Sequence, residues 1–179
     1  MPNISRRRFC IAAAHAFTGL LVSPSFICCA PRSKEFSLKF FHTHTEECLE
    51  IRHTPGQCSN AIQGKLNSFL RDFRTEEVHS IDAKLLDILC EVQSATGFRG
   101  TIEIVSGYRS SQTNSQLSRK SRKVATQSLH MQGRAVDVRI QGLPTRTLRN
   151  TAAALQTGGV GYYAKSDFVH LDTGQFRTW

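Results

Sequence analysis

The sequence of 179 residues contains six cysteines, but no two of them have C-x-x-C spacing. That absence argues against a zinc site built from cysteine thiolates. Basic residues exceed acidic ones and give a formal net charge of +9, yet neither an aromatic-interleaved basic stripe nor zinc-finger spacing accompanies this charge. We therefore expect no nucleic-acid partner.

The first thirty residues contain no acidic residue at all. They open with the twin-arginine pattern Ser5-Arg6-Arg7-Arg8-Phe9, and residues 10–30 are largely apolar without Lys or Arg. This order predicts a removable twin-arginine export signal over residues 1–30, hence a periplasmic protein that meets the membrane only during export. An uncleaved membrane anchor is the alternative. Cleavage would lower the net charge to +6, because it removes three arginines and no acid.

Residues 31–179 show no repeat, low-complexity run or composition shift, and their number suits one ordinary domain with a real core. Three cysteines fall in this domain. Cys90 lies on the apolar side of a helical pattern, which predicts a buried thiol. Cys48 and Cys58 could pair in the oxidising periplasm, but a domain that folds before export cannot depend on that bond. The oligomeric state is not predicted.

Alternating apolar and polar residues indicate a short β-hairpin at the start of the domain, and 3.6-residue periodicity indicates helices further along. The expected strands cover residues 36–40, 48–51, 101–105, 134–140, 160–163 and 168–172. The expected helices cover residues 59–74, 83–96 and 144–156, with a polar helix or loop over 110–121. These elements predict an α+β domain with a small, mainly antiparallel sheet and helices packed on one face.

Strand periodicity separates two polar side chains from the core. In residues 135–140 the apolar residues alternate with Asp137, and in residues 168–172 they alternate with His170. Both polar side chains are therefore expected on the open face of the sheet. His130 can reach the same point from the preceding loop if Gly133 bends the chain. Two imidazoles and a carboxylate that meet from separate segments are what an open zinc site needs.

These residues occur in a recognisable order along the chain. The motifs are Ser106-Gly107-Tyr108-Arg109, then Ser128-x-His130-x-x-Gly133-x-Ala135-x-Asp137, then Val169-His170-Leu171-Asp172. They resemble the D-Ala-D-Ala metallopeptidase superfamily, which includes lysostaphin-type peptidases and the hedgehog domain. The twin-arginine leader and the segment Gly158-Gly159-Val160-Gly161-Tyr162-Tyr163 resemble the YcbK-like murein endopeptidases within it.

The resemblance implies one Zn²⁺ per chain, held by His130, Asp137 and His170 with water in the fourth position. Zinc lowers the pKa of such a water toward about 7 and polarises the scissile carbonyl. Arg109 matches the superfamily's substrate arginine and would donate hydrogen bonds to the developing oxyanion. Its alternative is a structural arginine at a turn.

Asp167 is the counterpart of a glutamate that much of the superfamily uses as general base, three residues before the last histidine. In a regular strand Asp167 would point away from His170, so the base role requires the strand to begin near Phe168. Asp172 is the alternative base, or it orients a ligand imidazole.

Three further residues of the motifs are candidates for substrate binding or for support of the ligands: Ser128, Tyr108 and Thr113. Ser128 and Thr113 are expected to line the pocket, and Tyr108 to pack its turn. His42 and His44 alternate on one face of the hairpin and are more naturally exposed than metal-bound.

The resemblance therefore predicts a zinc endopeptidase that hydrolyses peptide cross-links between the peptide stems of peptidoglycan. The same ligands fit a carboxypeptidase of the D-alanyl-D-alanine type, which removes a terminal D-alanine. Two alternatives are not enzymes: a wall-binding module that keeps zinc structurally, and a metal-free periplasmic binding domain.

Overall fold

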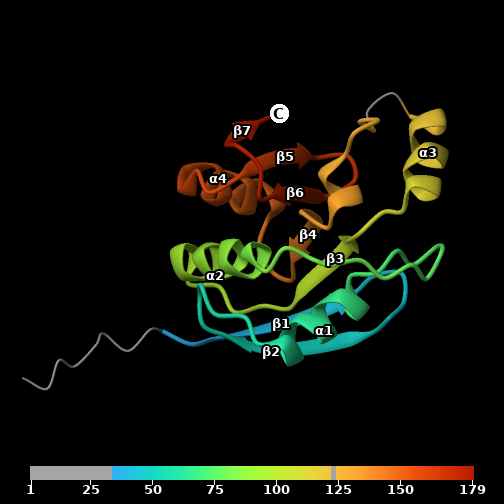
Figure 1. The fold of residues 1–179 in the computed structure, drawn as a ribbon. Coiled ribbons are helices and arrows are strands. Elements are labelled where there is room, and N and C mark those ends of the chain that lie inside the picture. The colour runs from blue at the N-terminus through green and yellow to red at the C-terminus, as the bar shows by residue number, and fades with distance from the viewer. Residues whose placement is uncertain (1–33, 122–123) are drawn as a thin grey trace, which may run out of the picture. The chain divides into compact units, whose positions relative to one another are not determined.

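The computed structural model describes residues 34–121 and 124–179, so the predicted export signal lies outside it. Within this part of the chain no helix is both long and apolar enough to cross a membrane. Ser33–Trp179 forms one compact unit. Its fold is mixed α/β, with one open sheet and four α-helices among the described residues (Figure 1).

The sheet has seven strands in the described ranges, in the order β2-β1-β3-β4-β6-β5-β7. The strands are β1 Phe36–His42, β2 Cys48–His53, β3 Ile102–Ser106, β4 Ala135–Ile140, β5 Gly159–Tyr163, β6 Phe168–Asp172 and β7 Arg177–Thr178. The opening hairpin and the four internal strands confirm the predicted ones, with small differences at their ends.

The expectation of a mainly antiparallel sheet is corrected, because the sheet is mixed. β1 runs parallel to β3, and β5 runs parallel to β7. The first pair arises because the chain leaves β2 and passes through two helices before β3 returns beside β1. A crossover of that length permits parallel pairing, which a tight hairpin turn does not.

The helices differ in how their ends are capped. They are α1 Asn60–Phe69, α2 Lys84–Thr96, α3 Ser111–Lys120 and α4 Thr145–Leu155, with a 3₁₀ turn, η1, at Leu129–Gln132. Ser59 and Ser110 cap α1 and α3, since each hydroxyl accepts a backbone N–H of the first turn. α2 stops at Gly97 as predicted, whereas α1 ends at Phe69, earlier than expected.

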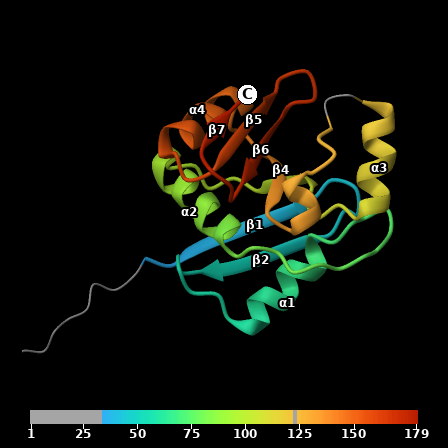
Figure 2. The same ribbon diagram turned by 45° about the horizontal axis from the view of Figure 1, so that its top comes forward.

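One face of the sheet carries the core. Apolar side chains that alternate along the central strands pack against buried residues of α1, α2 and α4, such as Leu66, Leu86 and Leu148. α2 lies beside α4 in both ribbon views, and α3 lies apart from them (Figures 1 and 2). The opposite face of β4 and β6 is thus free of these three helices and presents polar side chains. Three of the four described α-helices, α1, α2 and α4, thus contribute to this core.

The three cysteines of the described residues are free thiols. Cys90 is buried in α2, as its position in the helical pattern predicts. Cys48 is exposed and forms no bond with Cys58. The described residues therefore contain no disulfide.

Candidate metal centre

Asp137 and His170 face each other across two central strands. They are directly paired in the antiparallel register of β4 and β6. Opposite residues of antiparallel strands place their side chains on the same face, a few ångströms apart. Asp137 is 4% exposed and His170 is 8% exposed, so both polar groups are withdrawn from bulk water. The prediction that they share the open face is confirmed.

His130 comes from η1, whose two ends fix its position. At the start, the Ser128 hydroxyl accepts the backbone N–H of His130. At the end, Gly133 has φ +65°, and an added Cβ there would collide with the carbonyl oxygen of Ser80. Only glycine adopts this positive φ without strain and also leaves room for the Ser80 carbonyl, which explains the bend predicted at this residue. His130 is thereby buried beside β4, 1% exposed.

Three donor atoms from these residues meet at one point. Nε2 of His130 lies 3.2 Å from Oδ1 of Asp137 and 3.1 Å from Nδ1 of His170. Nδ1 of His170 lies 2.9 Å from the same carboxylate oxygen. The set is the one group of at least three His, Cys, Asp or Glu side chains among the described residues that is arranged to hold a metal ion.

Each imidazole of the triad has an outer nitrogen, which faces away from the other two ligands, and an inner nitrogen, which faces them. The hydrogen bond at the outer nitrogen determines whether the inner one has a free lone pair. Nδ1 of His130 lies 2.7 Å from the carbonyl oxygen of Gly107, and Nε2 of His170 lies 3.1 Å from Oδ2 of Asp172. Both partners only accept, so these outer nitrogens carry the protons. In the neutral rings the two inner nitrogens then present lone pairs toward each other and toward Asp137. Such an arrangement repels itself unless a cation or a proton lies between them, so the residues fit a bound metal.

The protonation of the site follows from the same contacts. Burial lowers the pKa of His130 below its ordinary value, although Asp137 opposes this effect. Burial also acts on His170, but hydrogen bonds to Asp137 and Asp172 outweigh it and raise its pKa. For Asp137, burial favours the neutral acid, yet the two imidazoles hold its pKa well below the usual range. Without metal, one proton on His170 relieves the repulsion, and a metal ion would displace it.

Arg109 holds the second oxygen of the central carboxylate. Its Nη2 donates to Oδ2 of Asp137 at 2.7 Å, and its Nε donates to the Ser106 hydroxyl at 3.0 Å. A bulge in β3 before Ser106 adjusts the strand at this point. Nη1 of Arg109 has no hydrogen-bond partner among the described residues, and the side chain lines the cavity above the triad. One donor is thus left for a ligand.

The triad opens into a cavity of about 460 Å³. Ser128 and Leu129 contribute to one part of its wall, and Tyr163, Phe168 and Trp179 contribute to another. Among the described residues that line it, Asp137 is the only one with a carboxylate side chain. A general base in the form of a second acid is therefore not part of the wall.

Asp167 is not brought to the triad, although β6 begins at Phe168 as the base role requires. Its backbone has φ +50°, and its carboxylate accepts a hydrogen bond from the Thr145 hydroxyl at 2.7 Å. It lines a different cavity, beside Arg139. Asp167 thus lies in the turn before the strand, as the base role required, but in this left-handed conformation its carboxylate is bonded to Thr145 instead of meeting the triad.

The four candidates for substrate binding or for support of the ligands differ in whether they contact the triad or line the cavity. Asp172 is fully buried and contacts His170, the contact that an orienting role would need. Tyr108 packs its turn as expected: it stacks on His79 and donates to Glu77 at 2.6 Å. Ser128 lines the cavity, whereas Thr113 is buried in the first turn of α3 and does not.

Three features of the site were not predicted from the sequence. They are the aromatic wall of the cavity, formed by Tyr163, Phe168 and Trp179, the short strand β7, and the Gly107 carbonyl that pairs with His130. Tyr163 stacks on Phe168 with ring centroids 4.6 Å apart, and Trp179 lies 5.2 Å from the His170 ring. The sequence signal that could have indicated this wall is Gly161 in the segment Gly161-Tyr162-Tyr163, because a glycine inside a strand often marks the close approach of another group.

Comparison with known proteins agrees with this arrangement. The peptidase family model described as "Peptidoglycan L,D-endopeptidase MepK" matches residues 30–179. The chain belongs to this MepK family of peptidases. The MepK protein of Escherichia coli K12, named a peptidoglycan L,D-endopeptidase, is 38% identical over 161 residues, 89% of this chain and 88% of its own length. A probable MepK of Haemophilus influenzae is 44% identical over 122 residues, 68% of this chain and 66% of its own length. No solved structure matches significantly.

Proposed function

We propose that this chain is a zinc-dependent murein endopeptidase that hydrolyses L,D bonds in the peptide cross-links of peptidoglycan. Family membership and the printed activity of the relatives support the reaction class and the substrate. The observation that carries the metal dependence is the triad: both imidazoles have their outer nitrogens bonded to acceptors, so their inner lone pairs converge with the Asp137 carboxylate.

Zn²⁺ fits this donor set of two imidazoles and one carboxylate, with His130, Asp137 and His170 as its three protein ligands. When bound, zinc would supply a water of lowered pKa and would polarise the substrate carbonyl. The open position faces the cavity of about 460 Å³, where a peptide can enter. The geometry of the triad therefore supports the zinc ion that the family resemblance implied.

The chain's own residues have separable roles in the proposed reaction. Arg109 fixes one oxygen of Asp137 and keeps Nη1 for the substrate, so it would stabilise negative charge on the carbonyl oxygen. Asp172 holds the His170 ring in the metal-binding tautomer. Asp167 is left out of this set, because its carboxylate is bonded to Thr145.

We further propose that residues 1–30 are a twin-arginine export signal and that residues 31–179 act in the periplasm as one domain. The basic-then-apolar order of the leader supports the signal. The family match from residue 30 onward and the cell-wall substrate of the relatives support the location and the domain boundary.

The test is to incubate purified protein of residues 31–179 with isolated murein sacculi and to identify the released muropeptides by mass. We expect cross-linked dimers to be converted to monomers, activity to be lost with a chelator, and activity to return with zinc. Metal analysis should give one zinc per chain. His130→Ala should lose both zinc and turnover.

Other outcomes would identify the other functions. Release of a terminal D-alanine without loss of dimers would indicate a carboxypeptidase. Retention of zinc and binding to sacculi without any cleavage would indicate a wall-binding module. A protein that binds no zinc under these conditions would contradict the proposal.

A further inference from the structure

Trp179 is an exposed aromatic residue that is nevertheless held in place. Its side chain is 48% exposed. Its backbone accepts a hydrogen bond from Tyr162 N–H at 3.0 Å and donates to Val160 at 3.3 Å, which continues the pairing of β7 with β5. Its indole N–H donates to the Tyr163 hydroxyl at 3.1 Å. The ring also lines the cavity of the triad, so a ligand in that cavity can contact it.

Gly161 provides the space that this ring occupies. Gly161 is paired directly with His170 across β5 and β6. A Cβ added at Gly161 would lie 2.6 Å from Cε2 of the indole, too close for any real contact. The Trp179 ring therefore covers the open face of the sheet next to the triad, 5.2 Å from the His170 ring. Any side chain at position 161 would move it.

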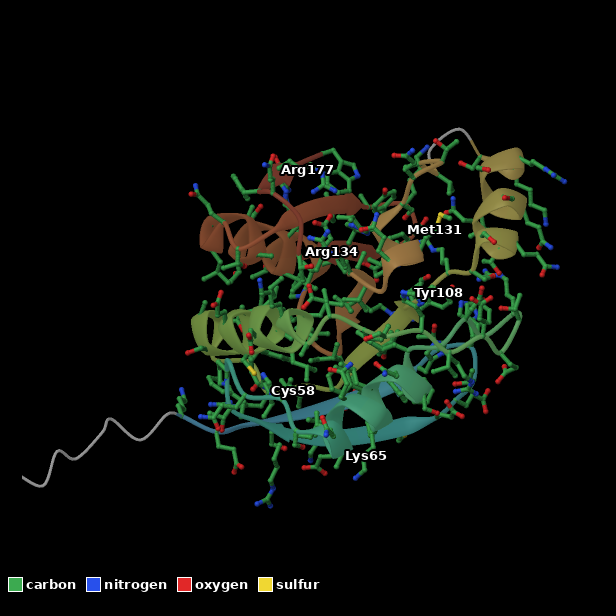
Figure 3. The ribbon with its side chains drawn as sticks, in the orientation of Figure 1. Cys58, Lys65, Tyr108, Met131, Arg134 and Arg177 are labelled. Carbon is green, nitrogen blue, oxygen red and sulfur yellow. The ribbon has the colours of Figure 1, made fainter. Side chains whose placement is uncertain are left out.

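Arg177 contacts both the Trp179 indole and Asp172, the carboxylate that pairs with His170. Its guanidinium lies over the indole, 4.9 Å from the ring centre, and donates to Oδ2 of Asp172 at 2.7 Å. That same oxygen is the partner of His170. Figure 3 shows Arg177 at the β7 end of the molecule, far from Cys58 and Lys65. Arg177 also lines the cavity beside these rings, and Asp172 balances its positive charge.

We propose that Trp179, with Tyr163 and Phe168, forms a subsite that takes the aliphatic part of one peptide arm of the substrate. The three rings line the same cavity as the triad. Arg109 and Ser128 also line this cavity and supply polar donors. A cavity with an aromatic part and a polar part distinguishes the two arms of a cross-link and so sets the direction in which the peptide lies. The inference rests on the proposed endopeptidase function.

The kinetic test compares wild type with Trp179→Ala, Trp179→Phe and Gly161→Ala on a purified cross-linked muropeptide dimer. We expect Trp179→Ala to lower kcat/KM about tenfold, mainly through KM, with zinc content unchanged, since an aromatic contact has this magnitude. Trp179→Phe should retain most of the activity. Gly161→Ala should lower kcat/KM by itself but cost nothing further in the Trp179→Ala background.

Phe176→Ala is the matched control, because Phe176 is 44% exposed in the same segment but does not line the cavity. It should behave as wild type. A second measurement uses fluorescence, since Trp179 is the single tryptophan of the sequence. In chelator-treated wild-type protein, which should bind but not cleave, the dimer should change the emission in a saturable way.

The outcomes separate the two proposals. If wild type cleaves the dimer but Trp179→Ala and Gly161→Ala both match it and the emission does not change, the subsite is disproved and the endopeptidase stands. If wild type never cleaves, the fluorescence titration alone decides the subsite. If Trp179→Ala loses zinc or unfolds, Trp179→Phe and the titration decide it, and an unchanged emission overturns the subsite.

Discussion

Nε2 of His170 lies 3.1 Å from Oδ2 of Asp172, a carboxylate that is fully buried and also bonded to Arg177. Burial would favour the neutral acid, but His170 and Arg177 lower the pKa of Asp172, so it remains ionised. An ionised acceptor at this position fixes the tautomer of His170 and directs Nδ1 toward Asp137 and His130. We therefore expect Asp172 to influence the affinity of the proposed metal site through His170, without contacting the metal itself.

Replacement of this carboxylate tests its orienting role. Asp172→Asn should weaken zinc binding about 10- to 100-fold, because the amide can present either an acceptor or a donor to His170. Competition with a chromogenic chelator measures the affinity. Asp87→Asn is the control, since Asp87 forms a comparable carboxylate–imidazole pair with His53 away from the site. Equal zinc affinities in wild type and Asp172→Asn would contradict the role.

Arg109 should matter for turnover more than for zinc. In Arg109→Lys a single ammonium replaces a guanidinium that contacts both Asp137 and Ser106. We expect kcat to fall about 100-fold, the effect of losing one oxyanion donor, while the zinc content stays at one per chain. Arg134→Lys is the matched control, because Arg134 bonds Thr173 and does not line the cavity. A kcat that is unchanged in Arg109→Lys would leave Arg109 a purely structural arginine.

Replacement of Asp167, unlike that of Arg109, should leave the turnover nearly unchanged. Its carboxylate is bonded to Thr145 and lines another cavity, so Asp167→Asn should keep zinc and should leave kcat/KM within about twofold of wild type. The muropeptide assay measures this directly. A large loss of kcat with zinc retained would restore Asp167 as the general base and would require the 163–168 turn to rearrange when substrate binds.

The convergence of His130, Asp137 and His170 could be predicted because it depends on local patterns. Alternation in β4 and β6 places Asp137 and His170 on one face, and a glycine at 133 bends the chain that carries His130. The parallel pairing of β1 with β3 depends on how a long crossover packs, which no local pattern encodes. The direction of Asp167 depends on one left-handed residue, and the position of Trp179 depends on a two-residue strand too short to show a period.

The last prediction concerns His42, which we expected to be exposed but which is fully buried at the end of β1. Its Nδ1 accepts the backbone N–H groups of His44 and Thr45, and its ring meets Phe69 edge-on. Its Nε2 has no hydrogen-bond partner in the described residues. Burial, with a smaller effect from His44, lowers the pKa of His42 to about 4.

The sign of the pH dependence follows from that value. The unfolded chain takes up a proton at His42 near pH 6.5, but the folded chain does so only near pH 4. Between these values the unfolded state binds more protons, so the stability that His42 contributes is present above pH 6.5 and is lost as the pH falls toward 4. The loss should reach about 3 kcal/mol at pH 4.

His42→Asn tests this directly, because asparagine keeps an acceptor near Nδ1 and does not titrate. Urea unfolding of the chelator-treated protein between pH 7.5 and pH 4 measures the free energy of unfolding without the contribution of zinc. The variant should be less stable than wild type at pH 7.5, because asparagine leaves a cavity, and the difference should shrink as the pH falls. Parallel curves for the two proteins would mean that His42 titrates normally, and its burial would then be too shallow to exclude the charged ring.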